Sequence, residues 1–173
     1  MSDTSYKTIK LDFVAEGLFE DRKSRFIAQL CHVETESEAQ EFLATVRAKH
    51  YNARHNVPAW ILEDGTERAS DDGEPSRTAG MPVLEVLRGA GLKNVCCVVT
   101  RYFGGTLLGP GGLVRAYTTA TQEALVAAEE ASAVQEMLQV VRVELSAPYN
   151  LYEQIQLREL IILTRLVRSL WLL

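Results

Sequence analysis

The chain has 173 residues, of which 47% are hydrophobic, and its formal net charge at pH 7 is −5. This length allows one full domain with a packed core and a smaller second unit. The acidic balance excludes a protein that binds nucleic acid through an overall basic surface. Residues 46–117 nevertheless carry nine Lys/Arg against seven Asp/Glu, which predicts a local basic face.

The N-terminal residues lack the apolar core of a signal peptide, and no run of about 20 apolar residues could span a bilayer. The three cysteines, Cys31, Cys96 and Cys97, lack metal-binding spacing, and the last two lie in an apolar run. They are interpreted as buried thiols of a reducing compartment. The sequence therefore predicts a cytoplasmic protein without membrane contact and without a cofactor.

The first half of the chain alternates between strand and helix patterns. Tyr6–Val14 and Ser24–Val33 are predicted strands that form an antiparallel pair across a polar segment. Thr35 and Glu38 have the spacing of a capping box, and apolar residues then recur at helical intervals. An amphipathic helix over 36–50 is expected to pack on the sheet.

The next segments alternate in the same way. Val57–Leu62 is a predicted short strand, and the apolar run Asn94–Phe103 predicts a central strand buried on both faces. Between them a helix is expected to begin near Pro82 and end by Gly91. A longer helix is predicted over 112–131.

The main domain is therefore predicted to cover residues 1–132, and residues 133–173 to form a second unit. Val134–Ser146 is a predicted strand, and a helix is expected from Pro148 through Leu157. The tail beyond Leu157 is apolar and punctuated by arginines. Such a segment is expected to pack on the main domain or on another chain, so a homodimer through it is one hypothesis.

Five glycines lie within residues 104–112, between the predicted central strand and the long helix. This glycine loop lacks the Lys-Ser/Thr pair of a P-loop and the spacing of a dinucleotide fingerprint. Free N–H groups at a helix start attract anions, and Arg101, Tyr102 and Arg115 flank the loop. Both a structural turn and an anion-binding loop remain open.

Two shorter segments also contain groups that could act chemically. Asp71, Asp72 and Glu74 could hold a hard cation or supply an acid/base pair, or Asp71 or Asp72 could simply cap local N–H groups in a solvated turn. Arg54 and His55 could contact phosphate or carry a proton, or could be ordinary surface residues. If one of the acids lies beside His55 and Arg101 in a cleft, an enzyme is favoured.

Several ordered motifs resemble the IMPACT family, in its bacterial YigZ-like branch. They span about residues 20–130 and are Arg22-Lys-Ser-Arg-Phe-Ile-Ala28, Ala53-Arg-His55, Ser70-Asp-Asp-Gly-Glu-Pro75, Thr78-Ala-Gly80, Arg101-Tyr-Phe-Gly-Gly105 and Leu108-Gly-x-Gly-Gly-Leu-Val-Arg-Ala-Tyr117. The resemblance implies a domain similar to domain IV of elongation factor G, followed by a small ferredoxin-like domain. The residues after 133 are too few for that second domain, so a truncated or frame-altered remnant is expected.

The resemblance points toward RNA, the ribosome or a translation-regulatory partner. Eukaryotic relatives are associated with restraint, through protein binding, of a kinase that inhibits translation initiation. The family supplies no catalytic constellation.

Together, these observations predict an α/β (α+β) two-layer sandwich with a mixed sheet and helices mainly on one face. The predicted function is non-enzymatic, translation-linked binding. The alternatives are a small metal-assisted hydrolase or phosphate-handling enzyme, with metal on Asp71, Asp72 and Glu74, and a protein-interaction module. The predicted binding residues are Arg54, His55, Arg101, Tyr102, Gly104, Gly105, Gly111, Gly112 and Arg115.

Overall fold

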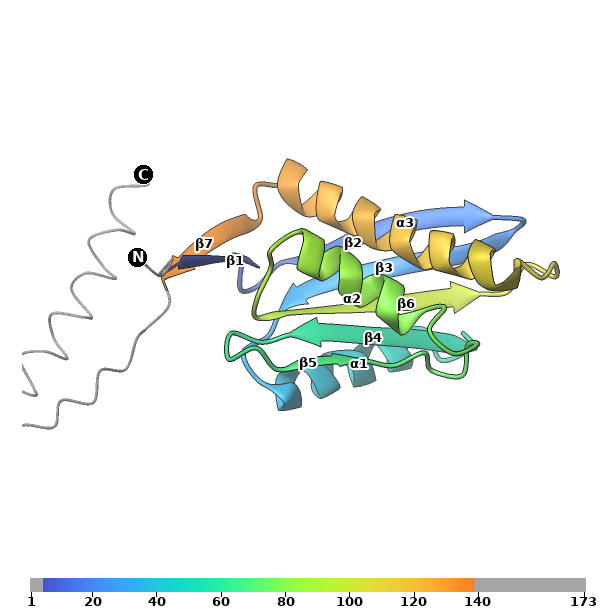
Figure 1. Cartoon of the computed structure of the whole chain (residues 1–173), viewed down its shortest axis with the longest axis horizontal. Coiled ribbons are helices and arrows are strands. Elements are labelled where there is room, and N and C mark those ends of the chain that lie inside the picture. The colour runs from blue at the N-terminus through green and yellow to red at the C-terminus, as the bar shows by residue number, and fades with distance from the viewer. Residues whose placement is uncertain (1–4, 139–173) are drawn as a thin grey trace, which may run out of the picture. The chain divides into compact units, whose positions relative to one another are not determined.

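The computed structural model describes residues 5–138, which form an α+β domain. Strands and helices follow one another in an order that begins and ends with strands (Figure 1). In chain order they are β1 (Ser5–Ile9), β2 (Val14–Asp21), β3 (Ser24–His32), α1 (Glu36–Lys49), β4 (His55–Ile61), β5 (Glu67–Ala69), α2 (Gly80–Gly89), β6 (Val95–Tyr102), α3 (Gly109–Glu130) and β7 (Val134–Leu138).

Five strands form the main sheet in the order β2-β3-β6-β4-β5. The predicted central strand is confirmed, because β6 lies between β3 and β4 and is buried along almost its whole length. The prediction of a mixed sheet is wrong: every ladder of this sheet is antiparallel. α1 joins β3 to β4, which run in the same direction, and β6 lies between them in the opposite direction, so the two parallel strands are not neighbours.

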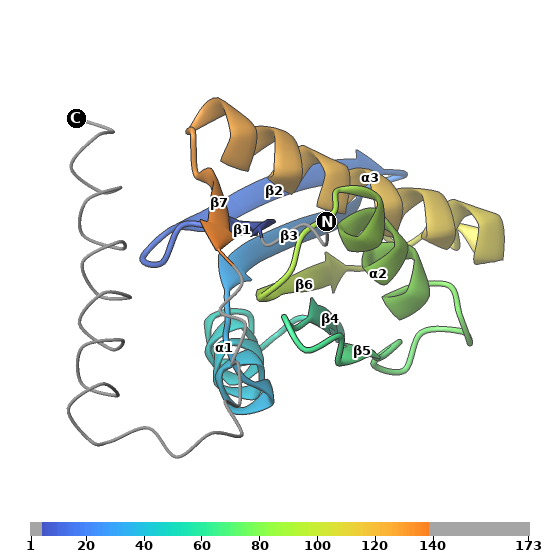
Figure 2. The ribbon, with the colours of Figure 1, turned by 60° about the vertical axis from the view of Figure 1, so that its left-hand side comes forward.

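Helices cover both faces of the sheet, so the predicted two layers are three, although α2 and α3 lie on the same face and the helices are therefore mainly on one face, as predicted. Alternate residues of β6 point to opposite faces. Val95, Cys97 and Val99 join a core with α2 and α3, whereas Cys96 and Val98 join a second core with α1. Figure 2 shows α1 on the side of the sheet opposite α2 and α3.

The first predicted strand, Tyr6–Val14, covers β1 and the turn after it, and its predicted antiparallel pairing with Ser24–Val33 is wrong. β1 ends at Ile9 and β2 begins at Val14, and a turn at Lys10–Phe13 separates them. β2 pairs with β3 through a tight turn in which Arg22 and Lys23 both have positive φ. β1 instead pairs with β7, antiparallel, in a separate two-stranded sheet.

The three helices lie close to their predicted positions. The Thr35 hydroxyl accepts a hydrogen bond from the Glu38 N–H at 3.2 Å, which confirms the predicted cap of α1. α2 begins at Gly80, two residues before Pro82. α3 begins at Gly109 and has Pro110 in its first turn, where a missing N–H costs nothing.

The described residues belong to one compact unit. The predicted domain boundary near 132, the ferredoxin-like second unit and the dimer contact concern the end of the chain, most of which lies outside the described residues. Within residues 5–138, no helix is long and apolar enough to cross a membrane.

The three cysteines are buried free thiols, as predicted. Burial raises the pKa of Cys31 and of Cys97 to about 12, and it raises the pKa of Cys96 as well. Because the thiolate is the nucleophile, we expect native protein at pH 8 to react slowly with Ellman's reagent and all three thiols to react rapidly in urea. A fast-reacting thiol in the native protein would contradict this burial.

Candidate functional site

Strand alternation brings Arg101 and His55 together on the α3 side of the sheet. Arg101 is opposite Phe26 on β3 and opposite His55 on β4. The Arg101 guanidinium carbon lies 5.5 Å from the centroid of the Phe26 ring, a cation–π distance. Arg101 is only 6% exposed, so it needs a buried anion.

Glu74 supplies that anion from the loop between β5 and α2. Arg101 Nη1 donates a hydrogen bond to Glu74 Oε1 at 2.6 Å, and the Tyr117 hydroxyl of α3 donates to the same oxygen at 2.8 Å. Burial raises the pKa of Tyr117, and the charge of Glu74 raises it further. The phenol therefore stays neutral and acts as a donor.

His55 completes this group with a defined tautomer. Its Nδ1 lies 2.8 Å from the backbone carbonyl oxygen of Asp72, which can only accept, so Nδ1 carries the proton. Nε2 lies 4.0 Å from Glu74 Oε1. Glu74, Arg101, Tyr117 and His55 thus form one polar group, called the Glu74 cluster below.

The other two acids of the segment have structural roles. Asp71 accepts hydrogen bonds from the N–H groups of Arg77, Ala79 and Gly80 and so caps the start of α2. Asp72 accepts from the Asn56 N–H and pairs with Arg47. The three carboxylates therefore bind different partners and do not converge on one cation site, which was the alternative considered for Asp71, Asp72 and Glu74. No group of three potential metal ligands occurs within residues 5–138.

A pocket of about 350 Å³ opens beside the Glu74 cluster at the start of α3. Glu74, His55 and Arg101 form its polar part, with Arg54. Its remaining lining is mainly apolar and comes from Pro75, Phe103, Leu107, Leu108, Gly109, Pro110 and Leu113. This Glu74 pocket lies within the size range of small-ligand sites, about 300–1,000 Å³.

The glycine loop packs against the β2–β3 turn and then enters α3. The Gly104 N–H donates to the Ser24 hydroxyl at 3.0 Å, and a Cβ on Gly104 would lie 2.1 Å from the carbonyl carbon of Lys23. Gly105 has a φ of +89°, which favours glycine. Gly111 has open space around it, whereas Gly112 packs on Leu108.

Six of the nine predicted binding residues do not line the pocket: the four glycines Gly104, Gly105, Gly111 and Gly112, and the side chains of Tyr102 and Arg115. Tyr102 points to the α1 face because it follows Arg101 in the strand, and its hydroxyl lies 2.9 Å from His50 Nδ1. Arg115 pairs with Asp21 at 2.6 Å. Arg101 and Tyr102 therefore point to opposite faces of the sheet and cannot both contact the same group of a ligand.

The glycine-loop end of the sheet carries exposed cations and exposed aromatic rings. Arg54 and Lys23 are exposed and form no ion pair within residues 5–138. Tyr51 is 85% exposed and Phe103 is 47% exposed. Phe103 and Arg54 both line the Glu74 pocket.

Sequence reasoning missed Phe103 as a site residue, and it identified Tyr117 only as one of the groups that flank the glycine loop. Tyr117 lies at a buried position of α3, where a hydroxyl requires a polar partner. That requirement was the available signal for a buried polar group nearby.

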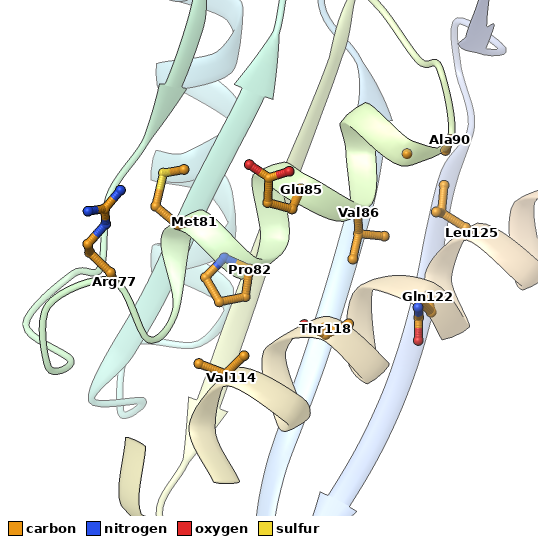
Figure 3. A pocket seen from close by; sticks show the side chains of 11 residues that line it. Arg77, Met81, Pro82, Glu85, Val86, Ala90, Val114, Thr118, Gln122 and Leu125 are labelled. Carbon is orange, nitrogen blue, oxygen red and sulfur yellow. The ribbon is translucent and has the colours of Figure 1, made fainter. Parts of the chain in front are cut away.

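A larger groove, of about 660 Å³, lies between α2 and α3 (Figure 3). Its lining is mainly apolar, with Met81, Pro82, Val86 and Leu125 among the residues that Figure 3 labels. None of the binding residues predicted from the sequence lines this groove. The Glu74 pocket is therefore the candidate functional site.

Comparisons with known proteins identify the family to which the chain belongs. Residues 22–125 match the family model described as the Impact N-terminal domain. The IMPACT family member YvyE of Bacillus subtilis (strain 168) is 51% identical over 123 residues, which are 70% of this chain and 56% of that protein. The IMPACT family member YigZ of Escherichia coli (strain K12) is 46% identical over 110 residues, 61% of this chain and 54% of that protein.

One solved structure, described as the crystal structure of a hypothetical protein, is 37% identical with a TM-score of 0.72 and covers 78% of this chain and 65% of its own. The chain spans about half the length of the curated relatives it matches. The family model covers more than half of the chain, and its range contains every residue that lines the Glu74 pocket. The chain therefore belongs to the IMPACT family, as a bacterial YigZ-like member.

Proposed function

We propose that the protein is a non-enzymatic, translation-linked binding protein that contacts RNA through the glycine-loop end of its sheet. Family membership supports the link to translation. At this one end, cations that form no ion pair within residues 5–138 lie together with exposed aromatic rings, and this combination is the observation that supports the RNA contact. Cations that follow the backbone and rings on which bases stack are what single-stranded nucleic acid requires.

The contact residues differ in part from those expected from the sequence. Arg54 keeps its proposed role, because it is exposed and borders the pocket. Lys23 joins it from the β2–β3 turn, which packs against Gly104. Arg101 is instead proposed to position Glu74, since its guanidinium is already paired inside the protein.

A test uses fluorescence anisotropy with a labelled 12-nucleotide RNA at several salt concentrations. We expect affinity to fall with salt, and the Lys23→Ala/Arg54→Ala variant to reduce the salt slope by about 1.4, since each single-strand phosphate contact contributes about 0.7. The matched control is Lys7→Ala/Lys10→Ala, which removes the same charge from exposed positions at the opposite end (Figure 1). Equal slopes for the two variants would contradict this surface.

One observation favours a phosphate-handling enzyme as a second candidate. Glu74 lies beside His55 and Arg101 in one pocket, the arrangement that sequence reasoning set as its criterion. However, Glu74 Oε1 is occupied by two donors, and no Ser, Thr, Cys or Lys is among the described residues that line the pocket. Binding therefore remains the preferred function.

A further inference from the structure

A further pocket, of about 410 Å³, lies at the end of the main sheet opposite the glycine loop. β3 begins beside that loop at Ser24 and ends at His32, which lines the pocket (Figure 1). Three acids, Asp12, Glu34 and Glu38, and an apolar wall of Leu11, Phe13 and Val14 also line it. This His32 pocket shares no lining residue with the Glu74 pocket.

The hydrogen bonds of His32 fix the position of the proton on its neutral ring. The Thr8 hydroxyl donates to the backbone carbonyl oxygen of Asn94 at 3.1 Å, so it has no second proton for His32 Nδ1, which lies 2.9 Å from the same hydroxyl. Nδ1 therefore donates, and Nε2 is left as an acceptor. Nε2 is buried without a hydrogen-bond partner within residues 5–138, and the His32 side chain is only 4% exposed.

A second acceptor faces this ring nitrogen. Glu34 Oε1 lies 3.6 Å from His32 Nε2, and neither atom can donate to the other while the ring is neutral. Such a pair is stabilised by a donor, either a second proton on the ring or an N–H group of a ligand. Because the Glu34 side chain is 61% exposed, a ligand can reach Nε2 by displacing this carboxylate toward solvent.

The charge of the His32 pocket favours a cation. Three acids and no Lys or Arg line it, and within residues 5–138 none of these acids pairs with a Lys or Arg. Burial raises the pKa of Cys31, which also lines the pocket, and the charge of Glu38 raises it further. Since no group of three potential metal ligands occurs within the described residues, an organic cation suits the pocket better than a metal ion.

The apolar wall indicates what kind of organic cation fits. Leu11 and Val14 are exposed and Phe13 is half-buried, so an aliphatic stem would cover apolar surface there. A guanidinium packs on aromatic rings and is more weakly hydrated than an ammonium, so it loses less solvation beside a buried ring nitrogen. Both properties favour a guanidinium over an ammonium.

We propose that the His32 pocket binds a guanidinium group carried on an alkyl stem. The guanidinium donates to His32 Nε2 and to the Glu34 carboxylate, and the stem lies along Leu11 and Phe13. A free alkylguanidine and an arginine side chain of a partner protein share this chemistry. The proposal is independent of the proposed RNA contact, which lies at the other end of the sheet.

Neutral probes of the same shape test the requirement for a cation. Calorimetric titrations of the full chain at pH 8 compare n-butylguanidinium with n-butylurea, in which an oxygen replaces one nitrogen and the charge is lost. We expect the guanidinium to bind about tenfold more tightly, as one hydrogen bond to a charged group allows. A tripeptide with a central arginine and its citrulline analogue make the same comparison for a side chain of a polypeptide.

A surface variant and the histidine rings test the placement. Glu34→Gln removes one charge at an exposed position and is expected to weaken butylguanidinium binding about fivefold. Glu41→Gln is the matched control, because Glu41 is exposed on α1 and lies outside the pocket. In nitrogen-15 NMR spectra, saturation with butylguanidinium is expected to shift the Nε2 resonance of His32 toward that of a hydrogen-bonded nitrogen, while the ring resonances of His50 and His55, which lie outside the pocket, stay unchanged.

The outcomes separate this pocket from other acidic surfaces of the protein. Guanidinium-selective binding that shifts His32 and that Glu34→Gln weakens supports the proposal, and the butylguanidinium and tripeptide arms show which source the pocket accepts. Equal affinity for the charged and neutral probes, or no binding of any probe, overturns it. Binding that leaves the His32 resonance unchanged also overturns it, because the cation then lies elsewhere.

Discussion

Replacing Arg101 by methionine is expected to lower the free energy of unfolding by about 3–5 kcal/mol, the cost of leaving one member of a buried ion pair alone. The side chains of Arg101 and Glu74 are 7% and 3% exposed and lie 2.6 Å apart. Methionine keeps the apolar stem against Phe26 but leaves Glu74 with Tyr117 as its only hydrogen-bond donor within residues 5–138. Urea unfolding followed by circular dichroism measures the loss.

The control for this variant is Arg88→Ala. Arg88 also pairs with a carboxylate, Glu67, but its side chain is 40% exposed, and such surface pairs contribute about 0–1 kcal/mol. The double variant Arg101→Met/Glu74→Met is expected to lose less stability than the sum of the two single variants, because it buries no unpaired charge. If Arg101→Met were as mild as Arg88→Ala, the pocket would solvate Glu74 well enough to replace the guanidinium.

The position of Arg101 could be predicted from the sequence, but its partner could not. The apolar run of β6 predicted a central strand, and that strand is present. A strand with both faces buried also sends Arg101 inward at its end, next to α3. Its partner Glu74 is 27 residues away in the chain, so no local pattern identifies the pair.

Local signals were reliable where the partner groups are close in sequence. The cap formed by Thr35 and Glu38 spans four residues and correctly predicted that α1 begins at residue 36. The helix ends at Lys49, one residue before the predicted end. The alternative in which Asp71 caps local N–H groups is likewise confirmed by its hydrogen bonds. It could be predicted because the groups that Asp71 caps lie within nine residues of it. By contrast, β1 separates from β2 without a glycine or proline to mark the turn, and its partner β7 is more than 120 residues away.

The glycine loop combines both kinds of signal. Its glycine density correctly indicated a shaped turn before a helix, but the sequence could not distinguish glycines that pack on protein from glycines that leave space for a ligand. The structure separates them by what surrounds each one. Gly104 lies against the backbone of the β2–β3 turn, and Gly111 faces open space.

The variants Gly104→Ala and Gly111→Ala should therefore have opposite effects on stability. In Gly104→Ala the new Cβ would lie 2.1 Å from the Lys23 carbonyl carbon and 2.2 Å from the Ser24 nitrogen, and backbone atoms cannot rotate away. Overpacking of this kind costs about 1–3 kcal/mol or more in the free energy of unfolding. Gly111→Ala meets nothing within 4 Å and replaces a helical glycine, so a gain of up to about 1 kcal/mol is expected.

Urea unfolding of the two variants and the parent protein measures both effects. Because the two positions share one loop, a general response of the loop to lost flexibility would change both variants in the same direction. Opposite signs would instead show that Gly104 is required by the close approach of the β2–β3 turn. An unchanged stability in Gly104→Ala would mean that the turn moves away from the loop, and Lys23 would then not be held beside Gly104 as the proposed RNA contact requires.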